Sequence, residues 1–103
     1  MKDRIRKFID YLENEKHASG NTRVSYQRDL LQMADFLEDL EIRETQRVTK
    51  TALNSFILKL EKDGKAASTI SRTLASMKAF FSYEFRMGRI KRDPAETIHA
   101  PKI

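Results

Sequence analysis

The chain has 103 residues but no cysteine and no tryptophan, and it holds only two histidines, three glycines and two prolines. Without cysteine it can form neither a disulfide framework nor a thiolate metal site. His17 and His99 alone are too few for a histidine-based zinc centre. We therefore expect no bound metal and no cofactor.

Long apolar runs are missing as well. No segment approaches the roughly 20 apolar residues that a membrane-spanning helix needs, and none has the pattern of a signal peptide. Hydrophobic residues make up 40% of the chain, which suits one modest core. We expect a single soluble domain in the cytoplasm, without a membrane partner.

No set of residues is typical of a complete active site. The glycines are isolated, the acids are spread over helix faces, and no Ser, His and acid stand at a plausible spacing. Tyr11, Tyr26 and Tyr83 each lie in or beside an apolar stripe, which favours core packing with the hydroxyl at the rim over a nucleophilic role. We predict no catalytic residue in this chain, no small-molecule substrate, and no complete enzyme.

Apolar residues recur at helical spacing in four segments, and none alternates as a strand would. In the fourth, Ile70, Leu74, Met77 and Phe81 form the stripe, which Phe80 and Phe85 widen. We expect an all-α fold, a four-helix bundle with a C-terminal linker tail. The expected helices run from about Lys2 to Lys16, from the break at residues 19–22 to Leu40, from Thr49 to Asp63, and from Lys65 to Gly88.

The helix ends have local signals. Hydroxyl and amide side chains favour the N-cap position, and Gly64 suits a left-handed C-cap. Asp93 and Pro94 break the helical pattern, so we expect a helical domain over residues 1–92 and the start of a linker over 93–103. The linker would hold a short turn over 95–100 and extended chain over 101–103. The candidate N-caps are Ser19 or Asn21, Thr49 or Thr51, and Ser68 or Thr69.

The net charge of +5 is unevenly distributed. Residues 1–61 hold equal numbers of basic and acidic side chains, whereas residues 62–92 carry a net charge of +6. A polyanion is the natural partner of such a field, although a basic surface that binds nothing remains the alternative.

The polar faces of the second and fourth segments strengthen this interpretation. Acids follow late in the second segment, at Asp35, Glu38 and Asp39, where they oppose the helix dipole. The polar face of the fourth segment, from Ser68 to Lys78, presents hydroxyls and cations without a carboxylate, whereas a solvated face would alternate Glu with Lys. Both patterns suit helix N-terminal turns that face phosphates. For the fourth segment, a Ser-rich helix packed closely on a neighbour fits equally well.

Three motifs together resemble the tyrosine recombinases. Ser19-x-x-Thr22-x-x-x-Tyr26-x-x-Asp29-Leu30 is similar to their S-x-x-T-x-x-x-Y-x-x-D-L motif. Residues 68–83, S-T-I-S-R-T-L-A-S-M-K-A-F-F-S-Y, resemble S-T-x-x-R-x-L-x-x-L-R-x-F-F-x-Y, and residues 93–102 resemble the N/D-P…P-K exit. The motifs occur in the family's order over nearly the whole chain, and they look most like phage and transposon integrases and Xer recombinases.

The resemblance implies a SAM-like core-binding domain, which in the family forms half of a clamp around duplex DNA. The family's catalytic Arg, Lys, His and tyrosine belong to a second domain that this chain lacks. Lys78 stands where the family more often has Arg, which exchanges a bidentate fork for a point charge. That exchange keeps a phosphate contact plausible and weakens guanine readout.

Our hypothesis is a DNA-binding module of a site-specific recombinase or integrase, with duplex DNA and sibling subunits on DNA as partners. Most contacts would go to phosphates, and Arg72 is the best candidate for a base edge. The alternatives are a helical protein-interaction or oligomerisation module and a free-standing helix-turn-helix regulator built on the third and fourth helices. The candidate contacts are Thr22, Arg23, Arg28, Lys65, Ser68, Thr69, Ser71, Arg72, Ser76 and Lys78.

Overall fold

The computed structural model describes residues 1–99, and over this range the regular structure is entirely helical. The elements are α1 (Lys2–Asn14), α2 (Gly20–Asp39), the short 3₁₀ helix η1 (Thr45–Arg47), α3 (Lys50–Lys62) and α4 (Ala67–Arg86). The prediction of an all-α fold with four helices is confirmed. The helix η1 was not expected, because its sequence reads only as a polar connection. No helix among residues 1–99 has the length and apolar character to cross a membrane.

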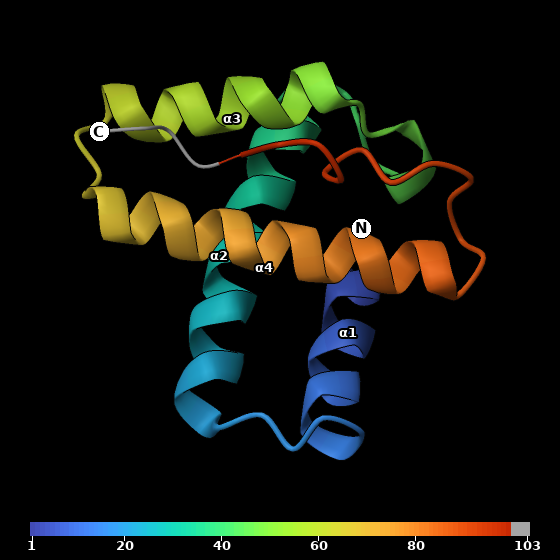
Figure 1. Ribbon diagram of the computed structural model, residues 1–103. Coiled ribbons are helices and arrows are strands. Elements are labelled where there is room, and N and C mark those ends of the chain that lie inside the picture. The colour runs from blue at the N-terminus through green and yellow to red at the C-terminus, as the bar shows by residue number, and fades with distance from the viewer. Residues whose placement is uncertain (100–103) are drawn as a thin grey trace.

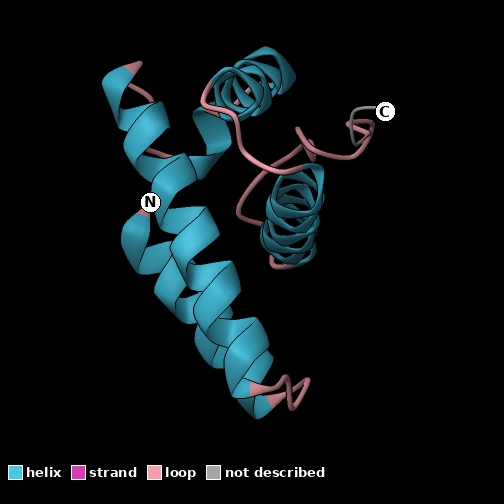
Figure 2. Cartoon of the chain, turned by 90° about the vertical axis from the view of Figure 1, so that its left-hand side faces the viewer, coloured by secondary structure: helices cyan, strands magenta, loops and turns pink. Residues whose placement is uncertain are grey.

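The helices form two layers. α1 and α2 lie side by side as an antiparallel hairpin, and α4 runs across this hairpin with α3 next to it (Figure 1). In the view turned by 90°, α3 and α4 lie together on one side of the hairpin (Figure 2). α2 and α4 each contact all three other helices, so the crossing of these two long helices organises the domain.

The core forms where the apolar stripes of the helices meet. The ring centroids of Phe8 in α1 and Phe80 in α4 lie 5.6 Å apart in an edge-to-face arrangement. The rings of Phe80 and Phe81 meet in the same way, with their centroids 5.0 Å apart. Such aromatic pairs stabilise the fold by more than the burial of their apolar area alone. Tyr83 is buried, and the other two tyrosines are partly buried against the core, as their positions in the stripes predict.

Phe85 is a correction to the predicted stripe. Its side chain is 49% exposed, whereas Phe81, one turn earlier, is fully buried. An α-helix turns by about 100° per residue, so Phe85 lies just beyond the buried arc of α4. Spacing alone could not show where that arc ends.

Two predicted caps are confirmed by hydrogen bonds. The Oγ of Ser19 accepts the backbone N–H of Thr22 at 3.1 Å, before α2. The Oγ1 of Thr49 accepts the backbone N–H of Ala52 at 3.1 Å, before α3. Each cap satisfies an N–H group that the first helical turn leaves without a partner.

The prediction for the start of α4 is wrong. Its N-cap is Ala66, which makes no side-chain cap bond, so Ser68 and Thr69 already lie inside the helix. α3 and α4 are each followed by a glycine with positive φ, Gly64 at 78° and Gly88 at 75°. This left-handed conformation favours glycine because a Cβ atom would be strained there.

The C-terminal segment packs on the helices. Ile90, Ala95 and Ile98 are buried in the core, and the Asp93 carboxylate accepts the backbone N–H of Ala95 at 2.9 Å. The packed core therefore continues past Arg92, after which we expected the linker to begin. The extended stretch expected over residues 101–103 lies outside the described residues.

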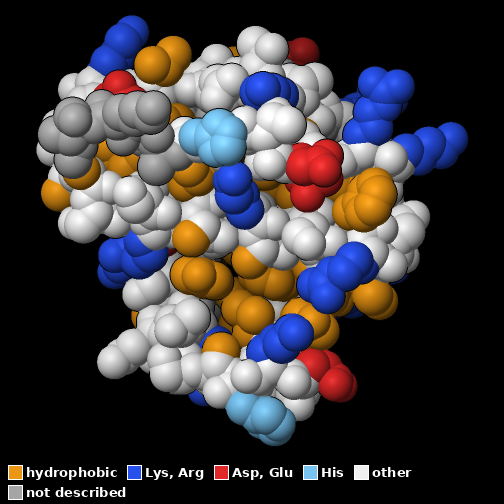
Figure 3. All heavy atoms as spheres, viewed as in Figure 1, with side chains coloured by type: hydrophobic (Ala, Val, Ile, Leu, Met, Phe, Trp, Pro, Cys, Tyr) orange, Lys and Arg blue, Asp and Glu red, His pale blue; other side chains and the backbone are white. Residues whose placement is uncertain are grey.

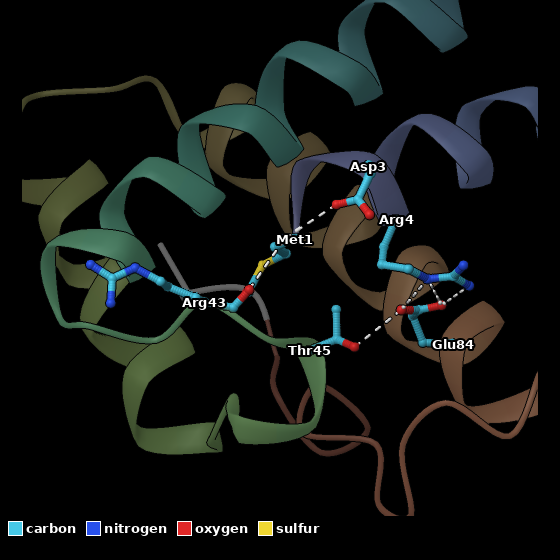
Figure 4. Close-up of polar contacts among 6 residues, drawn as sticks. All are labelled: Met1, Asp3, Arg4, Arg43, Thr45 and Glu84. Atoms are coloured by element: carbon cyan, nitrogen blue, oxygen red, sulfur yellow. Dashed lines mark hydrogen bonds and ion pairs between the residues drawn. The ribbon is translucent and has the colours of Figure 1, made fainter.

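A buried carboxylate near the end of α4 ties three elements together (Figure 4). Glu84 is fully buried, and its Oε2 accepts a 2.8 Å hydrogen bond from Nη2 of Arg4 in α1. Its Oε1 accepts the hydroxyl of Thr45 in η1 at 3.1 Å. The hydrogen bond to Glu84 raises the pKa of the Arg4 guanidinium, so this partner is charged at any ordinary pH. Sequence periodicity did not identify this network.

Removing the arginine from this network should destabilise the domain strongly. Arg4→Ala leaves a buried carboxylate without its cation, which typically costs about 3 kcal/mol. We expect this loss in the free energy of unfolding, measured by urea denaturation at neutral pH. The matched control is Lys2→Ala, because Lys2 pairs with Asp35 at 2.8 Å on the exposed surface of the same helix. That variant should unfold almost as the parent does, and equal losses in the two variants would contradict the role given to Glu84.

Candidate nucleic-acid interface

The predicted contact residues of α2 divide into two groups. Thr22 and Arg23 are partly buried and take part in local structure, because Thr22 bonds the cap residue Ser19 through both its backbone N–H and its hydroxyl. Arg23 lies 3.5 Å from the Glu13 carboxylate of α1. Arg28 is exposed and has no ion-pair partner among residues 1–99. It is therefore the α2 cation with the most freedom to meet a ligand.

Several predicted contacts lie together on the outer face of α4. Ser68 and Ser71 are exposed, Lys78 is half-buried, and Lys65 is exposed just before the helix begins. Residues three, four and seven apart share a helix face. Lys78 follows Ser71 by seven residues, or two helical turns, and so lies on the same side of α4. Thr69 is half-buried at the side of this face.

Ser76 is a correction. Its side chain is fully buried, and its Oγ donates a 2.6 Å hydrogen bond to the backbone carbonyl of Thr73. The residues three before and four after it, Thr73 and Phe80, are buried too, so Ser76 lies on the packed side of α4 and cannot contact DNA here. A small hydroxyl residue fits a packed or a solvated face, and the sequence could not separate these roles.

Arg72 is bound to a carboxylate of the neighbouring helix. Its Nε and Nη2 donate to the two oxygens of Asp29 in α2 at 2.9 Å and 3.0 Å. Asp29 is 2% exposed, while the Arg72 side chain is 37% exposed. The hydrogen bond to Asp29 raises the pKa of the Arg72 guanidinium, so the arginine stays charged. Sequence reasoning selected Arg72 but assigned no role to Asp29, although an acid beside the apolar stripe of α2 was an available signal.

A shallow hollow joins four of the predicted residues. Arg28, Lys65, Thr69 and Arg72 line a space of about 350 Å³ where α2 approaches the start of α4. Three of the four are cations, and the one acid of the hollow, Asp29, is already paired. Lys78, Ser68, Ser71 and the α2 start lie outside this hollow.

A second basic region lies at the other end of α4, and the candidate contacts did not include it. A larger hollow, about 1060 Å³, is lined by Lys50, Arg89, Lys91 and Arg92 together with the exposed ring of Phe85. On the face that carries α4 and the C-terminal segment, Lys and Arg side chains are spread widely and Asp and Glu are few (Figure 3). Within residues 1–99 no three His, Asp or Glu side chains lie close enough to hold a metal ion.

The fold and this surface define an all-α domain in which two crossing helices carry a basic hollow. The chain belongs to the phage integrase N-terminal SAM-like domain family, whose model matches residues 5–88. The family resemblance inferred from the three motifs is thereby confirmed. No solved structure gives a significant match to the chain.

Three relatives of the chain are named tyrosine recombinase XerC. A tyrosine recombinase XerC from Roseiflexus sp. (strain RS-1) is 34% identical over 103 residues, which is all of this chain and 33% of the relative. XerC of Herpetosiphon aurantiacus is 32% identical over 103 residues, again all of this chain and 34% of the relative. XerC of Actinobacillus pleuropneumoniae serotype 7 is 36% identical over 95 residues, 92% of this chain and 31% of the relative. The chain thus spans about a third of the length of the relatives it matches.

The pairing of Arg72 predicts different stabilities for two neighbouring arginine variants. Arg72→Ala leaves the buried Asp29 without its donors, which should lower the free energy of unfolding by roughly 1–3 kcal/mol. Arg28→Ala removes the same charge from an exposed site in the same hollow and should leave stability nearly unchanged. Thermal unfolding followed by circular dichroism compares the two. A similar melting temperature for both variants would show that the pair does not stabilise the fold.

Proposed function

We propose that this chain is the DNA-binding core-binding domain of a site-specific tyrosine recombinase or integrase. In this role it clamps duplex DNA, mainly through phosphate contacts, for DNA integration or recombination. The observation that carries the proposal is the hollow of Arg28, Lys65, Thr69 and Arg72, which combines cations of two helices in one place. Membership of the phage integrase N-terminal SAM-like family and relatives named tyrosine recombinase support it.

The basic residues would act mainly on the DNA backbone. Arg28, Lys65 and Lys78 are the cations of the candidate set with no ion-pair partner among residues 1–99, and Ser68 and Ser71 add small exposed donors. Contacts to phosphates position a protein on the duplex but carry no sequence information. Thr22 and Arg23 remain candidates at the start of α2, where the helix dipole favours an anion.

The rest of the reaction would be carried out by other parts of a longer protein. The relatives are about three times as long as the matched segment, and a catalytic domain in that remainder would form the other half of the clamp. We assign no catalytic residue, cofactor or metal to this chain. Its partners would be duplex DNA and sibling recombinase subunits bound to the same DNA, in the cytoplasm.

Salt-dependent binding to random-sequence duplex DNA tests the proposal. Fluorescence anisotropy with a labelled duplex, titrated at several salt concentrations, should give an affinity that falls log-linearly as salt rises, because bound phosphates release counterions. A lack of binding even at low salt would overturn DNA binding by this domain alone.

A single cation without an acid partner among residues 1–99 should contribute one phosphate contact. We expect Lys78→Ala to weaken binding to all duplex sequences alike and to lower the salt slope by about one unit. Lys7→Ala is the matched control, because it removes the same charge from an exposed position on α1. If Lys78→Ala weakened binding to one sequence only, Lys78 would read a base and the phosphate assignment would be wrong.

A protein-interaction module remains the second candidate, and one observation favours it. Phe85, which lines the larger hollow with several cations, is 49% exposed, and Met87, two residues later, is 59% exposed. An exposed apolar group rimmed by positive charge suits an acidic partner or a sibling subunit. Binding to a protein partner without salt-dependent binding to random DNA would favour this function.

A further inference from the structure

The guanidinium of Arg72 is held from one side only. Arginine has five N–H donors, and Asp29 takes up Nε and one N–H of Nη2. The remaining edge, formed by Nη1 and the second N–H of Nη2, makes no hydrogen bond within residues 1–99. That edge is a complete fork of the kind that binds two oxygens of a phosphate at once.

Asp29 offers a rigid support for this fork. It is 2% exposed, it lies near the middle of the long helix α2, and the next residue, Leu30, is fully buried. The carboxylate therefore cannot turn out into solvent without disturbing the packing between α2 and α4. Arg72 itself remains partly exposed and lines the same hollow as Arg28 and Lys65.

We propose that Asp29 is a positioning residue for DNA binding, which holds Arg72 so that its free fork meets one phosphate in the hollow. The inference rests on the proposed function and makes its contact specific. Arg72 is thereby reassigned from a base edge to the DNA backbone, because its guanidinium is bound to Asp29 of α2 and shares the hollow with two further cations. A side chain that is already held in place loses less conformational freedom when the ligand binds.

Charge alone predicts the opposite effect of Asp29. Its carboxylate lies close to the expected phosphate and repels it, and replacing it with asparagine raises the formal net charge of +5 by one. On electrostatic grounds this substitution should strengthen binding to DNA. A positioning role predicts weaker binding, since the asparagine amide holds the guanidinium less firmly. The sign of the change in affinity thus separates the two effects.

The experiment compares Asp29→Asn with Asp63→Asn in fluorescence anisotropy titrations of this chain with a random-sequence duplex. Asp63 is the control, because it is an acid whose pKa is lowered by Lys59 and also by Lys65 of the hollow, and its side chain is 44% exposed. We expect Asp63→Asn to bind as tightly as the parent or more tightly. Asp29→Asn should bind about tenfold more weakly, the size expected for one lost arginine contact. Binding by Asp29→Asn as tight as by Asp63→Asn would overturn the positioning role.

Two further measurements separate positioning from a folding defect. Titration of each variant with duplex far above the dissociation constant gives the fraction of active protein, which a positioning role leaves unchanged. Arg72→Lys keeps the charge and loses the fork, so it should weaken binding about as much as Asp29→Asn does. The double variant should lose little more, because both changes remove the same contact. Parent-like affinity of Arg72→Lys would overturn the proposal even if Asp29→Asn failed to fold.

The chain without substitutions, here called the parent, separates failure of the proposed function from failure of this inference. If the parent binds no duplex at any salt concentration, the proposed function fails and this inference fails with it. If the parent binds and only the behaviour of Asp29→Asn and Arg72→Lys departs from expectation, the inference fails alone.

Discussion

The packing of α4 across the α1–α2 hairpin is the contact on which the rest of this domain depends. The apolar stripe of α4 packs in the core, and a buried acid paired with an arginine lies near each end of the helix. Near its start, α4 contributes Arg72 to the Asp29 carboxylate of α2. Near its end, α4 contributes the carboxylate, Glu84, to Arg4 of α1. α4 therefore supplies the arginine of one pair and the acid of the other. In each pair the arginine compensates the buried carboxylate, which would otherwise be costly to bury.

These pairs also decide which charges remain for a ligand. Both acids are buried against arginines, so their negative charge contributes little to the surface near α4. The exposed cations Arg28 and Lys65 and the half-buried Lys78 then make this surface positively charged. The domain thereby combines a helix held firmly at both ends with a basic surface on that helix. A rigid cationic surface is what binding to a phosphate backbone requires, because preorganised groups lose little entropy on binding.

Local signals predicted much of the fold. The four helices, the caps at Ser19 and Thr49 and the glycines after α3 and α4 depend on side chains and backbone within one or two turns, and each followed from residue type and spacing. Three details did not follow. The N-cap of α4, Ala66, has no side chain that could signal a helix start. Phe85 lies just past the edge of the buried arc. Ser76 has a size and polarity that fit a buried or an exposed helix face. For the candidate interface, the charge distribution and motifs named Arg28, Lys65, Thr69 and Arg72 without showing that they share one hollow.

Residue spacing, charge and motifs along the chain were enough to predict four amphipathic helices, the concentration of positive charge around the last of them, and the recombinase family. These properties depend on neighbours along the chain and on composition. The pairing of acids with arginines follows from the three-dimensional packing, because the partners are 43 residues apart for Asp29 and Arg72 and 80 apart for Arg4 and Glu84. The same packing also decided that Ser76 is buried and that the residues after Arg92 return to the core. Such outcomes depend on how the helices cross, which periodicity along a single helix does not specify.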